Sequence, residues 1–305
     1  MSMRYQAGII LPGYNPLLVP DAPTIGTATA GINSASVTFT APANVGGGAI
    51  TGFTVQAIKT SDSSTTSASG ASSPISVTGL ASTAYTFKVF ATNAYGPSPL
   101  SAASNSASPI AVGDAFGGGF FAGQIGVSGV ATHNLVVGPV ASAQSSSKVY
   151  KNANTATAGA DSDIDGPQNT VDIVADGNST VYPAGHFCND LVIGGFSDWY
   201  MPAKNELEVC YYNLKPTTTV NYTLSGINAN AVPARASNYT TGTPAQTSAT
   251  DFRSTGAEDF AAFFYWSSTE GSATAAWLQS FGYGFQSNTT KNYSTYVRAI
   301  RRVAV

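Results

Sequence analysis

Four aspartates in the segment DSDIDGPQNTVD, residues 161–172, have the spacing of a cation-binding loop. They are Asp161, Asp163, Asp165 and Asp172. In a calcium loop, alternating carboxylates converge on one ion and a glycine, here Gly166, permits the sharp turn. The last ligand is usually Glu, and no helices are expected to flank this segment, so a solvated acidic turn is the alternative. A structural calcium ion is the only cofactor that the sequence suggests.

A second group of residues has the composition of a contact surface. The segment WLQSFGYGFQSNTTKNYSTY, residues 277–296, mixes rigid aromatics with small polar residues, as antibody loops do. The candidate binding residues are Trp277, Gln279, Tyr283, Phe285, Gln286, Asn288, Asn292 and Tyr293. Alternate residues must face the core, so Trp277, Phe281 and Tyr283 also fit a packing role. We expect exposure for Gln279, Gln286, Asn288, Asn292 and Tyr293.

Residues for catalysis are sparse. The two histidines, His133 and His186, have no evident nucleophile or metal set nearby in the sequence, and His186 with Cys188 is too little for a zinc site. The two cysteines, Cys188 and Cys210, do not make a disulfide scaffold. They are either paired or two buried thiols. We therefore expect no catalytic residues and no enzyme activity.

Composition excludes several classes of protein. Charged residues make up only 10% of the 305 residues, and the net charge of −3 provides no basic surface for nucleic acid. Hydrophobic residues are 43%, enough for a real core. No apolar run approaches the ~20 residues of a membrane span, and residues 1–13 do not resemble a signal peptide. A soluble, non-exported protein without membrane insertion is expected.

The elements that must position these residues follow from local patterns. Residues 1–20 contain three prolines in an apolar sequence and are predicted to be an extended attachment arm, with a disordered terminus as the alternative. Residues 21–109 alternate apolar and polar positions between Gly, Pro and Ser turns, which predicts a β-sandwich. Residues 113–305 form the expected second domain, beginning with a Gly-rich strand.

Residues 21–109 resemble a fibronectin type III domain. The matching parts are PDAPTIG, APANVGGGAITGFTV, GLASTAY and ATNAYGPSP, starting at residues 20, 41, 79 and 91. The resemblance implies that Tyr85 is the corner tyrosine, whose hydroxyl bonds to the backbone. Phe39 stands where the family usually has Trp, which implies a smaller core. A passive spacer is the role that this fold most simply implies.

The segment GGFSDWYMPAKNELEVCYYNLKP, residues 194–216, predicts a turn followed by one amphipathic helix from Ala203 to Leu214. It is similar to the signature of a C-type-lectin-like domain found in phage fibre tips and bacterial collagen-like adhesins. YWSSTE, AWLQSFGYGFQ and YVRAIRRV follow in the family's order, starting at residues 265, 276 and 296. The resemblance implies a small twisted sheet, two short helices, long binding loops and a homotrimer. It also implies that Trp199 and Pro202 are scaffold residues.

One position departs from that family. Members often have a cysteine in the last strand that pairs with one near Cys188, and this chain has Ala299 there. The usual disulfide is therefore impossible.

The expected fold is mainly β with a small α+β part: an arm, a fibronectin type III β-sandwich and a C-type-lectin-like α+β domain. The resemblance implies a bacteriophage virion protein, a tail fibre or receptor-binding protein whose last domain binds a host-surface glycan or protein. The arm would contact other virion proteins. A capsid-decorating fibre is the alternative, and a bacterial adhesin is disfavoured because no export signal is visible.

Overall fold

The computed structural model describes residues 18–305. The chain divides into two compact units between Ala111 and Val112, and each is described by itself. Within the described residues, no helix is long and apolar enough to cross a membrane. Apart from its last three residues, the predicted attachment arm at 1–20 lies outside the described part. Leu18 O accepts hydrogen bonds from Gly47 N at 2.9 Å and from Asn93 Nδ2 at 2.8 Å, so the end of that segment is fixed to the first unit.

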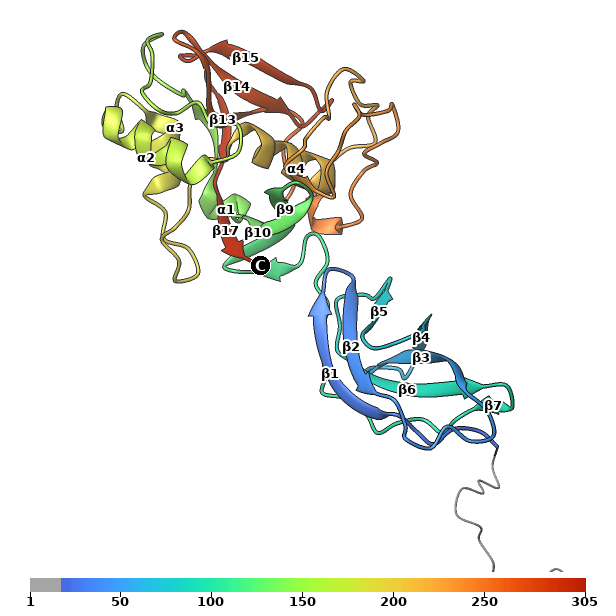
Figure 1. Ribbon diagram of the computed structural model, residues 1–305. Helices are drawn as coiled ribbons and strands as arrows, with labels where there is room; N and C mark the ends of the chain where they lie inside the picture. Colours follow the sequence, from blue (N-terminus) through green and yellow to red (C-terminus); the bar gives the residue numbers. More distant parts are fainter. Residues whose placement is uncertain (1–17) are drawn as a thin grey trace, which may run out of the picture. The chain divides into compact units, whose positions relative to one another are not determined.

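The first unit is a sandwich of two antiparallel sheets, as predicted (Figure 1). One sheet contains β1 (Thr24–Gly31), β2 (Ser34–Thr40) and β5 (Ile75–Thr78). The other contains β4 (Thr65–Gly70), β3 (Ile50–Lys59), β6 (Tyr85–Asn93) and β7 (Gly96–Pro97). Every second residue of β6, from Tyr85 to Asn93, is buried. This alternation places one face of the strand in the core.

Tyr85 is the predicted corner tyrosine. Its hydroxyl accepts a hydrogen bond from Ala81 N at 3.3 Å, and its ring is buried. Phe39, at the position usually held by Trp, is also buried, with its ring centroid 4.9 Å from that of Phe53. The smaller aromatic thus takes the expected place in this core.

Serines at every third position complete the edge of β6. Ser98 N and Ser101 N donate to Ala91 O and Val89 O at 2.7 and 2.9 Å. In return, Ala91 N and Val89 N each donate to the same serine's hydroxyl at 3.0 Å. Ser104 repeats this arrangement at Phe87. A segment with a three-residue period therefore satisfies strand donors that would otherwise be buried without partners.

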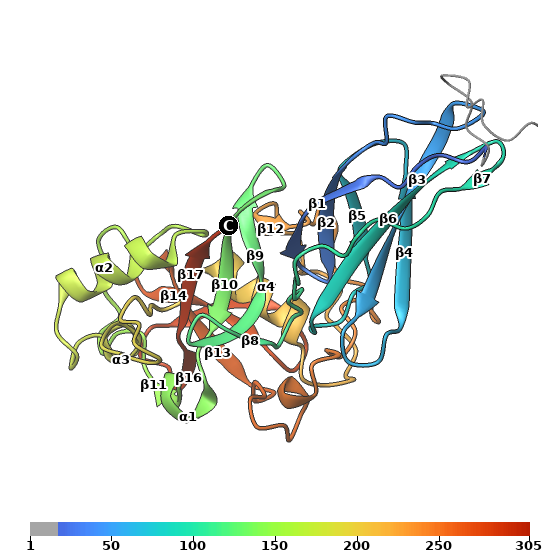
Figure 2. The ribbon, with the colours of Figure 1, turned by 90° about the horizontal axis from the view of Figure 1, so that it is seen from below.

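The second unit contains two five-stranded sheets. The first has the order β12 (Ala231–Val232), β9 (Gly119–Val127), β10 (Val130–Val137) and β17 (Ile300–Ala304), with β8 (Ala115–Phe116) paired to β9. Figure 2 shows β9, β10 and β17 side by side. The second has the order β11 (Gln144–Lys148), β16 (Thr295–Arg298), β13 (Phe264–Ser272), β14 (Ala275–Ser280) and β15 (Gln286–Thr290).

The helices of this unit are short. They are α1 (Val140–Ala143), α2 (Gly166–Asp176), α3 (Pro183–Asn189), α4 (Lys204–Leu214) and the 3-10 turn η1 (Thr250–Phe252). The expectation that no helix flanks the segment 161–172 is wrong, because α2 begins at Gly166. Asp165 caps it by accepting from Gln168 N at 3.3 Å, and Pro167 lies in its first turn.

Helix α4 matches its predicted range to within one residue, but it lacks the solvent-exposed polar face of an amphipathic helix. Glu206 closes the first turn by accepting from Ala203 N at 2.8 Å. The same carboxylate is fully buried and accepts from the Tyr200 hydroxyl at 2.6 Å and from Arg302 Nε at 2.7 Å. Burial raises the pKa of Glu206, and Arg302 opposes that shift. The charged residues of α4 thus serve internal contacts.

The turn before α4 is scaffold, as expected. Trp199 is 2% exposed, and its Nε1 donates to Phe196 O at 3.2 Å. Tyr200 N and O both pair with Ile300 of β17, at 2.9 and 3.0 Å. Gly194 has a φ of 62°, and a Cβ there would lie 2.9 Å from the Gly118 backbone. This turn therefore requires glycine and is fixed to both ends of the unit.

Both cysteines are free and buried, Cys188 beside Trp199 and Met201 in one cluster and Cys210 in another. Burial raises the pKa of each thiol. Of the two possibilities left open by the sequence, the structure has the two buried thiols.

Candidate binding face

The strands β14 and β15 carry half of the candidate binding residues. In their antiparallel register, Trp277 pairs with Asn288 and Gln279 pairs with Gln286. Directly paired residues project to the same face of a sheet. The two strands therefore bring these four side chains to one face, while Ala276 and Leu278 are buried on the other side.

Gln279 does not have the predicted exposure. It is fully buried, and its Nε2 donates to Gly284 O at 2.8 Å and Ser280 O at 3.3 Å. Among the described residues, Gln279 Oε1 has no hydrogen-bond partner. The side chain closes the 281–285 turn, because the backbone carbonyls of that turn need a donor. Gln279 therefore shapes the loop from inside and is not a contact residue.

Gln286 and Trp277 connect this face to α4. Gln286 is half-buried, and its Nε2 donates to Lys204 O at 2.9 Å. The Lys204 ammonium lies 4.2 Å from the Trp277 ring centroid and 3.2 Å from Asp163 Oδ2. One face of Trp277 is thus covered by a cation. Asn288 beside it is exposed.

A group of exposed aromatics lies where the turn between β14 and β15 meets two other loops. We call Tyr222, Phe263, Tyr283 and Phe285 the aromatic patch. Tyr222, Phe263 and Tyr283 are 46%, 61% and 54% exposed. Tyr222 N donates to Tyr283 O at 2.8 Å, and the Tyr222 and Phe285 ring centroids are 5.5 Å apart. Phe281 N donates to Phe263 O at 2.8 Å, which brings the third segment beside this turn, and the Phe263 ring stacks on Tyr296 with centroids 5.6 Å apart.

The sequence predicted only two of these four residues, Tyr283 and Phe285. Tyr222 lies in the segment between α4 and β12, and Phe263 directly precedes β13. The usable signal was an aromatic followed closely by a leucine in a predicted loop, NYTLSG, but local sequence does not say which loops meet. Val220 and Leu224, 60% and 71% exposed, extend the apolar character of the Tyr222 loop.

Buried Lys215 and Asn221 hold the loop that carries Tyr222. Lys215 Nζ donates to Thr219 O at 2.6 Å and to Pro244 O at 3.2 Å. Asn221 Nδ2 also donates to Pro244 O, at 2.9 Å. Burial lowers the pKa of Lys215. The ammonium and amide groups satisfy carbonyls of an irregular segment, so this loop is fixed by internal bonds.

Asn292 and Tyr293 are exposed as predicted, but they follow the far end of β15. Because strands rise about 3.3 Å per residue, the five residues of β15 separate them from the aromatic patch by roughly 15 Å. Tyr293 lies against Trp266, with ring centroids 6.5 Å apart. The predicted surface is therefore divided into two areas, joined by Asn288.

Two buried lysines fix the loop beside Asn292. Lys291 Nζ donates to Thr155 O at 2.7 Å and to Glu270 Oε1 at 2.8 Å. Lys151 Nζ donates to Ala156 O at 2.6 Å. Burial lowers the pKa of Lys291, and Glu270 opposes that shift. Ammonium groups thus satisfy the carbonyls of this loop.

The four aspartates predicted to form a calcium loop are Asp161, Asp163, Asp165 and Asp172. The structure does not bring them together. Asp163 pairs with Lys204, Asp165 caps α2, and Asp172 lies within α2, where it accepts from Gln168 Nε2 at 2.9 Å. Among residues 18–305, no group of three or more His, Cys, Asp or Glu side chains is arranged to hold a metal ion. Asp163, Asp165 and Asp172 have structural partners instead.

The two units have the domain types of an adhesin-like surface protein. Residues 21–107 match the model of the fibronectin type III domain, and residues 152–301 match the model of the Lcl C-terminal domain, a C-type-lectin-like, adhesin-type domain. No curated protein matches the chain.

Solved structures resemble about a third of the chain. Domains A168–A170 of titin are 26% identical over 30% of this chain and 33% of that one, with a TM-score of 0.28. The twitchin kinase region from C. elegans is 21% identical over 30% and 17%, with a TM-score of 0.28. The FN5 domain of Drosophila Lar is 23% identical over 30% and 97%, with a TM-score of 0.25. The chain covers about a third or less of the length of the titin and twitchin structures.

Proposed function

We propose that this chain is a bacteriophage virion protein, a tail fibre or receptor-binding protein, and that its second unit binds a host-surface glycan or protein. The observation that carries the proposal is the aromatic patch, in which three exposed aromatics come from three separate loops whose backbones meet through hydrogen bonds. Large contiguous apolar patches on protein surfaces often mark interaction sites. Aromatic side chains bury much area for little loss of rotamer freedom.

The remaining parts fit the same role. The fibronectin-like unit would act as a spacer, and residues 1–20 would bind other virion proteins. Homotrimeric assembly and a place on the particle surface belong to this proposal. The chain would need neither nucleic acid, membrane insertion nor catalysis for it.

The binding experiment measures how strongly three purified full-length proteins bind to host cells: the parent, a double variant and a control variant. Tyr222→Ser and Tyr283→Ser together should reduce binding at least tenfold, because each removes a large aromatic contact worth about 1 kcal/mol or more. The matched control is Tyr95→Ser on the first unit, where Tyr95 is 56% exposed. Binding should change little with salt, because the patch contains no charged residue.

Two results would overturn the proposal. If the double variant binds host cells as the parent does, the patch is not the receptor site. If the double variant alters the oligomeric state and leaves cell binding unchanged, the patch is a contact between copies of the chain. Labelling intact particles with an antibody to the second unit would separate the tail fibre from the alternative, a capsid-decorating fibre.

A further inference from the structure

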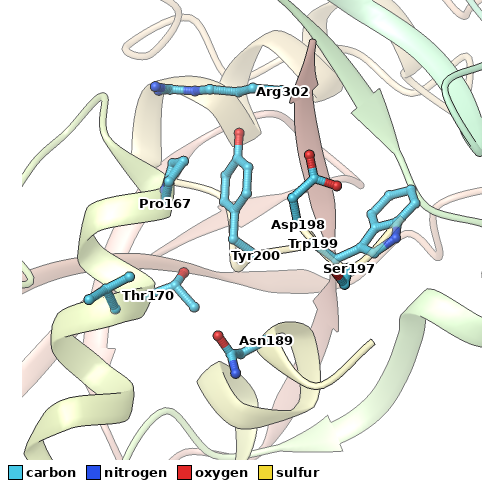
Figure 3. A pocket seen from close by; sticks show the side chains of 9 residues that line it. Pro167, Thr170, Asn189, Ser197, Asp198, Trp199, Tyr200 and Arg302 are labelled. Atoms are coloured by element: carbon cyan, nitrogen blue, oxygen red, sulfur yellow. The ribbon is translucent and has the colours of Figure 1, made fainter. Parts of the chain in front are cut away.

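A pocket of about 250 Å³ lies in the second unit between α2, the end of α3 and the turn before α4 (Figure 3). Its walls include Val171 on α2, Asn189 at the end of α3, Ser197 and Asp198 in the turn, and Arg302 on β17. No residue of the aromatic patch or of the 277–296 segment lines it. The pocket is therefore separate from the proposed receptor site.

The charged groups at this pocket already have counter-charges. Asp198 Oδ1 and Oδ2 accept from Arg301 Nε and NH2 at 2.7 and 2.8 Å. Arg302 Nε donates to buried Glu206 at 2.7 Å, and its NH1 lies 3.7 Å from Asp165. The site thus offers neither an unpaired cation nor an unpaired anion, so its charge does not select an ionic ligand.

The remaining polar groups of the pocket can form hydrogen bonds with hydroxyl groups of a ligand. The Ser197 side chain is exposed at the pocket, so its hydroxyl is accessible to a ligand. Asn189 Nδ2 donates one bond, to Asp190 at 3.0 Å, which leaves a second N–H and the side-chain oxygen for a ligand. Figure 3 shows the Asn189 amide pointing from α3 toward Thr170. Each Asp198 oxygen keeps a further lone pair.

An apolar wall faces these groups. Val171 is 57% exposed although it lies on a helix, and Pro167 lines the same side. A pyranose ring has this double character, with C–H groups on its faces and hydroxyls at its edge. Pockets for drug-sized ligands hold about 300–1,000 Å³. A volume of about 250 Å³ is the right size for one sugar ring.

We propose that this pocket binds one neutral pyranose unit of a glycan, with Asn189, Ser197 and Asp198 contacting hydroxyls and Val171 contacting the ring's C–H face. Hydroxyl groups can both donate and accept, which matches the mixture of donors and acceptors left at the rim. The site needs no metal ion.

The test is saturation-transfer NMR on the full chain with the methyl glycosides of glucose, galactose, mannose and N-acetylglucosamine. At least one should show transfer. Val171→Glu should abolish it, because the carboxylate occupies the apolar wall, and Asn189→Ala should weaken binding about fivefold through loss of hydrogen bonds. The matched control is Val220→Glu, an equally exposed valine outside the pocket, which should bind as the parent does.

Three outcomes would overturn the assignment. The first is that none of the four glycosides binds. The second is that Val171→Glu and Val220→Glu behave alike. The third is that methyl glucuronide or glucosamine binds more tightly than every neutral glycoside, which would make the ligand charged. Tyr283→Ser should leave sugar binding unchanged, so failure here is distinguishable from failure of the receptor proposal.

Discussion

Arg301 forms a two-pronged ion pair with Asp198, with Nε–Oδ1 and NH2–Oδ2 distances of 2.7 and 2.8 Å. The guanidinium also lies 3.8 Å from the Phe196 ring centroid, and its NH1 donates to Gly117 O at 2.8 Å. One side chain of the last strand therefore joins the start of the second unit to the turn in its middle. This closes the unit across 184 residues of sequence.

The Asp198–Arg301 pair predicts a pH dependence of stability. Arg301 lowers the pKa of Asp198, and the unfolded value is about 3.9. Because the folded pKa is the lower one, the stabilisation is present above about pH 4 and is lost as the pH falls through the folded pKa. Melting temperatures measured from pH 2 to 7 should show this loss, and Asp198→Asn should show a smaller one. Identical profiles for the two proteins would contradict the prediction.

Trp199→Ala should destabilise the second unit by about 3–5 kcal/mol, since it removes a large buried aromatic and leaves a cavity. Urea unfolding followed by a probe in the second unit would measure the change. Trp277→Ala is the matched control: this ring is only half-buried, so its loss should cost clearly less. Equal losses would show that burial does not distinguish the two tryptophans.

Ser101→Ala should cost the first unit about 1–3 kcal/mol, because Val89 N would be left buried without an acceptor. Ser106→Ala, at an exposed position five residues later, should be nearly neutral. Chemical denaturation of both variants gives the comparison. If Ser101→Ala unfolds as the parent does, the serine hydroxyl is not needed to satisfy β6.

Lys291→Met should destabilise the second unit by about 3–5 kcal/mol, since it leaves Glu270, which is only 10% exposed, without its cation. Adding Glu270→Gln should recover part of that loss, which a double-mutant cycle would measure. Lys59→Met, which breaks the exposed pair with Asp62, should cost at most about 1 kcal/mol. A loss no larger than that of the Lys59 variant would contradict a structural role for Lys291.

Local patterns in the sequence determined the elements. The alternation in residues 85–93 was enough to predict β6, and the resemblance to fibronectin type III domains implied the corner bond of Tyr85. The run after Pro202 predicted α4 to within one residue. These features follow from neighbours a few positions apart, where side-chain period, proline and capping decide the backbone.

Partners distant in sequence decided the sites. Asp163 pairs with Lys204, 41 residues further along the chain, and the Asp165 carboxylate lies 3.7 Å from Arg302 NH1 of the last strand. Tyr222 and Phe263 joined Tyr283 only because three loops meet. The pocket beside Val171 is likewise built from helices and a turn that no local pattern connects. Periodicity in the sequence determines which face of a strand or helix is buried. A binding surface depends instead on which distant segments come into contact, and those contacts exist only in the folded chain.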